Sequence, residues 1–219
     1  MEKTNSVHLN GVVNSCTVRP GADGARVADI SFHTLLPNPD APPDSDRKYI
    51  YEKHLVRVTG RGPEGDRLDE LERLCRSRVD VRDRTYDLRG VLREEGADVL
   101  VDCRAEDFVK SQVLELSRNN EAVMVGSVVR TTHTDRFASV VLDTGSGHVT
   151  AMLLKDDFGE AWESVAKGKV RKGSALSVKG PLRMVPMTDG KDLIFRSNVI
   201  PRIMEQVRLS QKRTVGPSL

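Results

Sequence analysis

The sequence has no apolar run near the ~20 residues that a membrane-spanning helix requires. Its start, MEKTNSVHLN, lacks the basic and then apolar order of a secretory signal, so we expect a cytoplasmic protein. Cysteine is scarce: Cys16, Cys75 and Cys103 are widely spaced and form no CxxC pair. This spacing indicates neither a disulfide framework nor a zinc site, and free buried thiols are expected instead.

Signatures of catalysis are missing as well. The five histidines are scattered, and no paired carboxylates or nucleophile motif accompany them. GxxxxGK[ST] and GxGxxG are absent from any strand-to-helix context, and the turn TGSG is not a phosphate loop. We therefore expect no enzyme, no cofactor and no metal; only nucleases that use dispersed acidic residues escape this reasoning.

The charge balance differs between the two halves of an otherwise ordinary globular composition, which is 38% hydrophobic and 30% charged. Residues 1–112 carry 18 basic and 21 acidic side chains, which leaves 16 basic and 11 acidic side chains in residues 113–219. A phosphate-binding surface is therefore expected in the second half. A merely solvated surface explains the same excess.

The chain repeats one plan. YDLRGVLR in the first half and LSVKGPLR in the second alternate apolar and polar residues around a glycine at the same step, Gly90 and Gly180. A period of two predicts a strand, and a glycine in mid-strand favours the sharp bend that lets a short sheet curl into a barrel. Each half also opens with an alternating strand that contains glycine, SVHLNGVV and AVMVGSVV.

Five strands are predicted in each half, with one helix between the third and the fourth. The other predicted strands are residues 25–35, 48–59 and 97–108 in the first half and 136–143, 148–154 and 191–200 in the second. The helices follow Asp66 and Asp156, where apolar side chains recur on one face. Leu68, Leu71, Leu74 and Cys75 share that face in the first, and Phe158, Ala161, Trp162 and Val165 in the second.

This order is that of an OB-fold, a small barrel that often binds oligonucleotides. We predict an all-β chain of two tandem five-stranded OB-fold barrels, with the first domain over residues 1–110, a linker over 111–120 and the second domain over 121–202. Residues 203–219 are expected to form a polar tail, for which a short helix at the start is one option. A proline-rich loop over 36–47 distinguishes the first barrel.

Several of these segments resemble the bacterial and phage single-stranded DNA-binding proteins. SVHLNGVV, VADISFHT and EKHLVRVTGR are similar to that family's first three strands, and KGSALSVKGPLR is similar to its fourth. Members with one barrel per chain form tetramers, so the resemblance implies a homodimer that presents four barrels.

The chain departs from the family at two places. Lys53 and Thr59 stand where the family commonly has base-stacking aromatic residues, so Tyr49 and Tyr51 on the same strand are the replacement candidates. The chain ends in KRTVGPSL rather than in an acidic tip, so the resemblance does not extend to the segment with which family members recruit replication partners.

The candidate nucleic-acid contacts are basic and aromatic residues at outward strand positions. They are Tyr49, Tyr51, Lys53, Arg57 and Arg89 in the first half, and Arg130, Arg136, Phe137, Lys155, Lys179, Arg183 and Arg196 in the second. A solvated sheet face is the alternative, Phe137 can equally be core, and Phe158 and Trp162 are expected to plug the open end of their barrel.

The leading hypothesis is a non-enzymatic protein that binds single-stranded DNA, or RNA, without sequence preference in replication, recombination or repair. The alternative is a tandem OB-fold interaction module of a replication or mobile-element complex, with little affinity for nucleic acid. Low aromatic content, 4%, favours the alternative.

Overall fold

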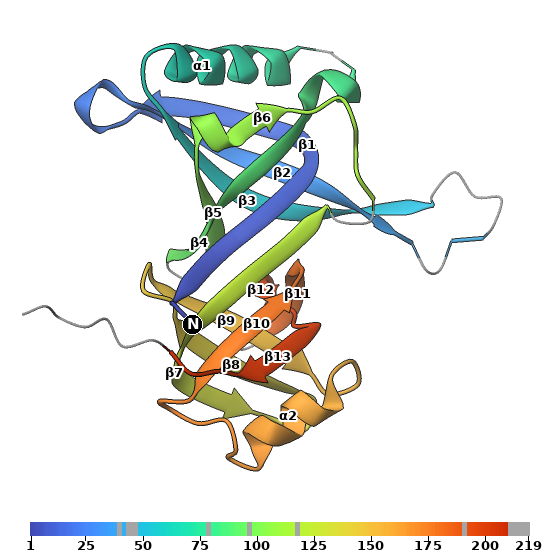
Figure 1. The fold of residues 1–219 in the computed structure, drawn as a ribbon. Coiled ribbons are helices and arrows are strands. Elements are labelled where there is room, and N and C mark those ends of the chain that lie inside the picture. The colour runs from blue at the N-terminus through green and yellow to red at the C-terminus, as the bar shows by residue number, and fades with distance from the viewer. Residues whose placement is uncertain are drawn as a thin grey trace, which may run out of the picture.

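A computed structural model describes residues 1–38, 41–42, 48–77, 80–95, 98–116, 119–189 and 192–209 (Figure 1). Within these ranges the side chains are described except at residues 81, 98, 187–189 and 192–197. The chain is mostly β, as predicted, and hydrogen bonds connect the thirteen strands of the described residues into one network.

The first half contains a closed barrel of five strands. Its strands are β1 (Thr4–Pro20), β2 (Arg26–Pro37), β3 (Tyr49–Gly60), β4 (Thr85–Glu95) and β5 (Asp98–Arg104), and the short β6 (Phe108–Lys110) pairs with β4. The pairing runs from β1 to β2, β3, β5 and β4, and β4 returns to β1. Phe32, Leu88 and Leu92 are among the fully buried side chains that fill this half.

Helix α1 (Pro63–Arg76) follows β3 and lies across one end of the first half (Figure 1). Pro63 suits the first turn because its missing N–H would have no partner there. The chain reaches it through Gly62, whose φ of +52° is a conformation that glycine adopts without steric cost. Leu68 and Leu71 face the core and are 2% exposed, as the apolar spacing predicts.

The second half repeats the strand pairings. Its elements are β7 (Asn120–His133), β8 (Phe137–Asp143), β9 (His148–Leu154), α2 (Gly159–Ala166), β10 (Ala175–Gly180), β11 (Leu182–Asp189) and β12 (Asp192–Val199). β7 pairs with β8 and β10, β8 with β9, and β12 with both β9 and β11. An OB-fold fits this arrangement.

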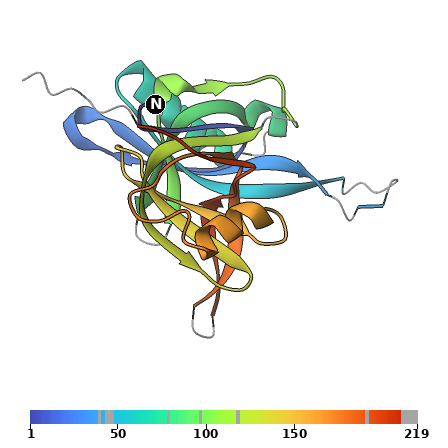
Figure 2. The ribbon, with the colours of Figure 1, turned by 60° about the horizontal axis from the view of Figure 1, so that its bottom comes forward.

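The strand predicted over LSVKGPLR is divided in two at Pro181. A Cβ on Gly180 would lie 2.0 Å from the carbonyl oxygen of Ile200, so only glycine permits this close crossing of two backbones. Pro181 has no N–H for a ladder bond, and it separates β10 from β11. β10 thereby pairs with β7, while β11 pairs with β12. The hairpin of β11 and β12 projects from the body of the molecule (Figure 2).

The two halves share a sheet and do not stand apart. β1 pairs with β7 in antiparallel register from Thr4 opposite Val125 to Leu9 opposite Asn120. Lys3 and Asp143 form an ion pair of 2.6 Å beside this junction. The last two residues of the linker predicted over 111–120, Asn119 and Asn120, are buried, and β7 begins at Asn120.

The tail does not open in a helix, so that option is wrong. Residues Ile203–Gln206 form a strand, β13, that pairs with β10 from Lys179 opposite Ile203 to Leu176 opposite Gln206. β10 offers an edge that β7 leaves free, and pairing with such a distant edge does not show in the local sequence. Within the described residues no helix is both long and apolar enough to cross a membrane.

Candidate nucleic-acid interface

One face of β3 carries four of the predicted contact residues. His54, Val56 and Val58 are buried, so the alternate side chains of this strand point outward. The outward set includes Tyr49, Tyr51, Lys53 and Arg57, as the alternation predicts. Tyr49 is 43% exposed and Tyr51 is 61% exposed, so both rings are accessible to a ligand.

The outer face of β2, β3 and β5 is hollowed by a groove of about 470 Å³, which we call the β3 groove. Strands two and three of an OB-fold are the face on which oligonucleotides bind. The lining of the groove combines apolar, hydroxyl-bearing and charged side chains. Its lining residues are Ser15, Asp29, Ile30, Ser31, Lys53, Leu55, Val56, Arg57, Glu95 and Leu100.

Arg57 is fixed in the wall of the β3 groove by two carboxylates. Its Nε donates to Asp29 Oδ1 at 2.8 Å, and its Nη1 lies 2.8 Å from Glu95 Oε2. Burial acts to raise the pKa of Asp29, but hydrogen bonds from Arg57 and Arg19 outweigh it and hold that pKa below its ordinary value. The charge of Arg57 is therefore neutralised in place, whereas Lys53 makes no ion pair with any described residue.

Lys53 stands beside two flat rings. The ring centroids of His33 and Tyr51 are 5.9 Å apart at an interplanar angle of 47°, and His33 is opposite Lys53 in the ladder of β2 and β3. Burial, followed by the charge of Lys53, lowers the pKa of His33. We call these residues the His33–Tyr51–Lys53 patch; it combines an ammonium group with two rings that can stack on bases. Sequence reasoning did not single out His33, although its place opposite Lys53 follows from the strand pairing.

Arg89 and Lys179 lie elsewhere, near the junction of the halves. In the strand ladders His8 is opposite Arg89 on β4 and opposite Glu121 on β7. His8 Nε2 lies 2.6 Å from Asp87 Oδ1, and Lys179 Nζ lies 3.1 Å from Glu121 Oε1. Acidic side chains thus lie among the basic ones near the junction, and neither Arg89 nor Lys179 lines the β3 groove.

A third group of predicted residues gathers where β8 meets α2. Lys155 Nζ lies 4.5 Å from the ring centroid of Trp162, a cation–π contact, and the Lys155 amide donates to the Arg136 carbonyl at 2.9 Å. Trp162 Nε1 donates to the Thr134 carbonyl at 3.1 Å, which fixes the ring against the β7–β8 turn. Arg136 is exposed, and half-buried Phe137 is opposite Leu154. We call Arg136, Phe137, Lys155 and Trp162 the β8–α2 cluster.

Trp162 and Phe158 both pack against the hydrophobic core, as predicted for plugs of the barrel end. The contact of Trp162 with Lys155 was not foreseen, because the two residues are seven apart across a turn. Arg130, on β7, is exposed beside the irregularity in the pairing of β7 with β8.

Arg183 connects the halves. Its Nη1 lies 3.1 Å from Glu52 Oε2, and the Met184 amide donates to Glu52 Oε1. The Glu52 side chain is only 11% exposed, whereas the Arg183 side chain is 32% exposed. Arg196 is opposite Val185 in the hairpin of β11 and β12, but its side chain lies outside the described residues.

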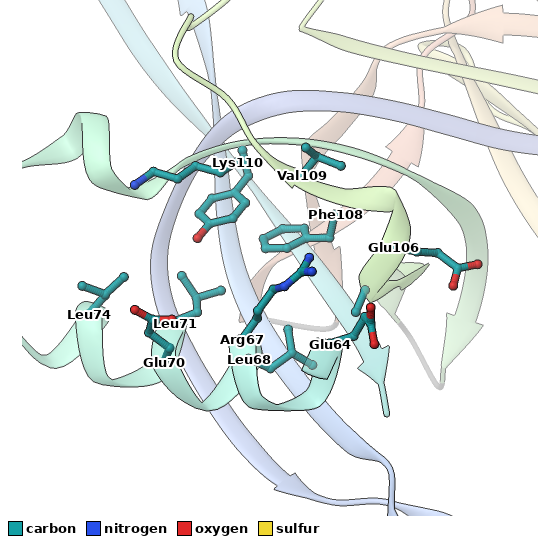
Figure 3. Close-up of a pocket in the computed structure, with 12 residues that line it drawn as sticks. Glu64, Arg67, Leu68, Glu70, Leu71, Leu74, Glu106, Phe108, Val109 and Lys110 are labelled. Carbon is teal, nitrogen blue, oxygen red and sulfur yellow. The ribbon is translucent and has the colours of Figure 1, made fainter. Parts of the chain in front are cut away.

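A second groove, of about 380 Å³, lies between α1 and β6 (Figure 3). Leu68, Leu71 and Leu74 of α1 line one side of this α1–β6 groove, and Phe108 lines the other. The rings of Phe108 and Tyr86 stack with their centroids 4.4 Å apart. The leucine spacing was assigned to the core, and nothing in it reveals that the face stays partly open.

Two of the three cysteines, Cys16 and Cys103, are buried as predicted, whereas Cys75 is half-buried. All three are free thiols, and burial raises the pKa of Cys16 and of Cys103 to about 12. In the part of the chain that the structure describes, no group of three or more His, Cys, Asp or Glu side chains is arranged to hold a metal ion.

No protein-family model and no curated protein sequence matches the chain. Its structure is similar to that of the wild-type single-stranded DNA-binding protein from Thermus aquaticus, with a TM-score of 0.61 and 16% identity over 96% of each chain. A deletion mutant of that Thermus aquaticus protein gives a TM-score of 0.60 and 15% identity over 96% of this chain and 98% of that one. The likeness shows the fold: over nearly its whole length the chain is built like that single-stranded DNA-binding protein, with an OB-fold.

Proposed function

We propose that this protein binds single-stranded DNA without sequence preference, in replication, recombination or repair, and that it is not an enzyme. The observation that carries the proposal is the His33–Tyr51–Lys53 patch, which meets the β3 groove at Lys53. It places two rings beside a lysine that has no ion-pair partner among the described residues, on the ligand face of an OB-fold. The structural likeness to the Thermus aquaticus protein supports it.

Binding would combine phosphate contacts with stacking. Lys53 would displace counterions from the backbone while Tyr49 and Tyr51 stack on bases, and Arg57 would line the groove. In the second half Arg130, Arg136 and Lys155 would supply further phosphate contacts beside Phe137. Arg89, Lys179, Arg183 and Arg196 complete the proposed set; of these, Lys179 and Arg183 form ion pairs with carboxylates.

The architecture that we propose for this function is two tandem OB-fold barrels, residues 1–110 and 121–202, joined over residues 111–120. The repeated strand pairings support it, since β7 pairs with β8 and β10 as β1 pairs with β2 and β4. Two chains would then assemble as a homodimer with four barrels. Single-stranded DNA is the expected partner, and RNA of the same length is the competitor to test against it.

The test is fluorescence anisotropy of a labelled thymine oligonucleotide, single-stranded and then duplexed, at several salt concentrations. We expect tight binding to the single strand, weak binding to the duplex and a steep loss of affinity with salt. Tyr51→Ala should weaken binding about fivefold or more, from the loss of about 1–3 kcal/mol of stacking. Ile50→Ala, which removes an exposed apolar side chain from the opposite face of the same strand, is the control. No binding at low salt would refute the proposal.

A protein-binding module is the second candidate, and the observation that favours it is the α1–β6 groove, in which leucine side chains and Phe108 are bordered by charged residues. It would take an apolar segment of a partner in a replication or mobile-element complex. Leu74→Arg would then abolish capture of that partner while leaving oligonucleotide binding intact, whereas Tyr51→Ala would have the reverse effect.

A further inference from the structure

A crevice of about 630 Å³ lies where the two halves meet, and it is separate from the β3 groove. The first half contributes Glu52 to its lining, and the second half contributes the rest. The residues that bear on its chemistry are Glu52, Phe158, Pro181, Arg183, Pro201 and Arg202. We call it the junction crevice; its volume falls within the range of sites that hold small ligands.

One wall of the junction crevice is held by direct backbone contacts. The Ile200 amide donates to the Pro181 carbonyl at 2.9 Å, and the Arg202 amide donates to the Lys179 carbonyl at 2.8 Å. Gly180 lets the two segments approach this closely, because a Cβ there would lie 2.0 Å from the Ile200 carbonyl oxygen. Pro181 and Pro201 are therefore fixed in the wall before any ligand binds.

The junction crevice offers two guanidinium groups. Arg202 is exposed and makes no ion pair with any residue that the structure describes. The Nη1 of Arg183 is held by Glu52, but a guanidinium has five N–H donors, and this side chain remains 32% exposed. Exposed Asp157 is the one other acidic residue in the lining.

An aromatic ring and a border with the β8–α2 cluster complete the site. Half-buried Phe158 lines the crevice, as does Leu154, which is opposite Phe137 of the β8–α2 cluster. Lys155 follows Leu154 directly, so the crevice opens beside the residues proposed to contact the backbone in the second half. The lining of the crevice and the β8–α2 cluster are therefore adjacent at Leu154.

We propose that the junction crevice holds one nucleotide of the bound single strand, with its base against Phe158 and its phosphate between Arg202 and Arg183. This assignment rests on the proposed function and deepens it, because it makes the place where the halves meet part of the binding surface. Glu52 acts as a positioning residue, since it holds Arg183 toward the crevice.

The test compares the full-length protein with Arg202→Gln and with Lys172→Gln, a control that removes one exposed lysine from the loop before β10. Affinity for a thymine oligonucleotide is measured over a series of salt concentrations. Log affinity falls as log salt rises, and each phosphate contact that is lost should make this negative slope shallower by roughly 0.7. We expect that shallower slope for Arg202→Gln and no change for Lys172→Gln.

The second readout needs no variant. An oligonucleotide that carries 5-iodouracil is irradiated on the wild-type protein, and the crosslinked peptides are identified by mass spectrometry. Crosslinks at Phe158 together with the shallower slope of Arg202→Gln would support the assignment. If the wild type binds, but crosslinks fall only on Tyr49 and Tyr51 and the slope of Arg202→Gln is unchanged, the crevice assignment is wrong and the proposed function stands. If the wild type binds no oligonucleotide, the proposed function fails, and the assignment fails with it.

Discussion

Asn5 and Asn120 play the same part in the two halves of the molecule. Asn5 Nδ2 donates to the Leu92 carbonyl at 2.6 Å while its Oδ1 accepts from the Leu92 amide at 2.9 Å. Asn120 makes the same two bonds to Leu182, at 2.6 and 2.8 Å. Each leucine follows a repeat glycine by two residues, so each asparagine side chain replaces a neighbouring strand at the point where the chain bends.

Replacing Asn120 with leucine should therefore destabilise the fold. The Leu182 amide and carbonyl would lose the partner that the structure gives them, and each buried group left without one costs about 1–3 kcal/mol. We expect the free energy of unfolding of Asn120→Leu, measured by urea denaturation, to fall by about 2–6 kcal/mol. Asn14→Leu, at an exposed position of β1, is the control; equal losses in both variants would contradict this account.

The repeat shows how far sequence reasoning reaches. Alternation predicted the strands, and the shared glycines predicted where the chain bends, because both are local properties. The pairing of β1 with β7 joins residues more than 100 apart, and the pairing of β13 with β10 uses the edge of β10 that its pairing with β7 leaves free. Neither the roles of Asn5 and Asn120 nor these pairings leave a local signal.

The candidate site could also be predicted only in part. Alternation placed Tyr51, Lys53 and Arg57 on one face, but it could not show that Asp29 and Glu95 neutralise Arg57. Glu95 reaches Arg57 from β4, a strand far along the chain, so the pair depends on barrel closure. The predicted residues also spread over several surfaces, since equal parity on different strands does not imply one face.

Removal of the Glu95 carboxylate should tighten DNA binding. Glu95→Gln would release Arg57 Nη1 and take a negative charge out of the β3 groove, so phosphate would meet less repulsion. We expect the dissociation constant for a thymine oligonucleotide to fall severalfold at low salt. Glu64→Gln makes the same change of net charge on α1, away from the groove, and should leave affinity nearly constant. Equal tightening in both variants would mean that only net charge matters.

DNA binding should strengthen as the pH falls toward 5.5, through His33. Burial and the charge of Lys53 place the pKa of His33 below its ordinary value, so its ring is neutral at pH 7. A nearby phosphate favours the protonated ring and raises that pKa, so the complex takes up protons that the free protein lacks. Anisotropy titrations between pH 7.5 and 5.5 should show a smaller gain for His33→Gln than for the wild type. His148→Gln, at an exposed position, should behave as the wild type, and identical curves for all three proteins would exclude His33.

The oligomer that we propose has a direct measure in molar mass. One chain is 24.3 kDa, and a homodimer with four barrels has twice that mass. Light scattering coupled to gel filtration should return the doubled value without DNA and at micromolar protein. A concentration-independent mass of one chain would reject the dimer while leaving the DNA-binding proposal untouched.

Acid should destabilise the fold through His54. This ring is fully buried, its Nε2 lies 2.8 Å from Thr34 Oγ1, and its Nδ1 has no hydrogen-bond partner among the described residues. Burial lowers its pKa from 6.5 to about 3, so in the folded protein the ring stays neutral. Below pH 6.5 the unfolded chain binds a proton at His54 that the folded chain does not bind. The free energy of unfolding is therefore unaffected by this group above pH 6.5 and decreases as the pH falls toward 3. The loss approaches about 1.4 kcal/mol per pH unit for one group.

His54→Gln replaces the titratable ring with a neutral polar side chain beside Thr34, so the unfolded chain no longer takes up a proton at this position. Its free energy of unfolding is expected to be lower than that of the wild type at pH 7, because the ring packing is lost, but to fall less steeply between pH 6.5 and 4.5. Other titrating groups act on both proteins alike, so the difference between the two slopes isolates His54. His148→Gln, which replaces an exposed histidine, is the control and should keep the wild-type slope. Parallel slopes for wild type and His54→Gln would show that another buried group governs the acid sensitivity.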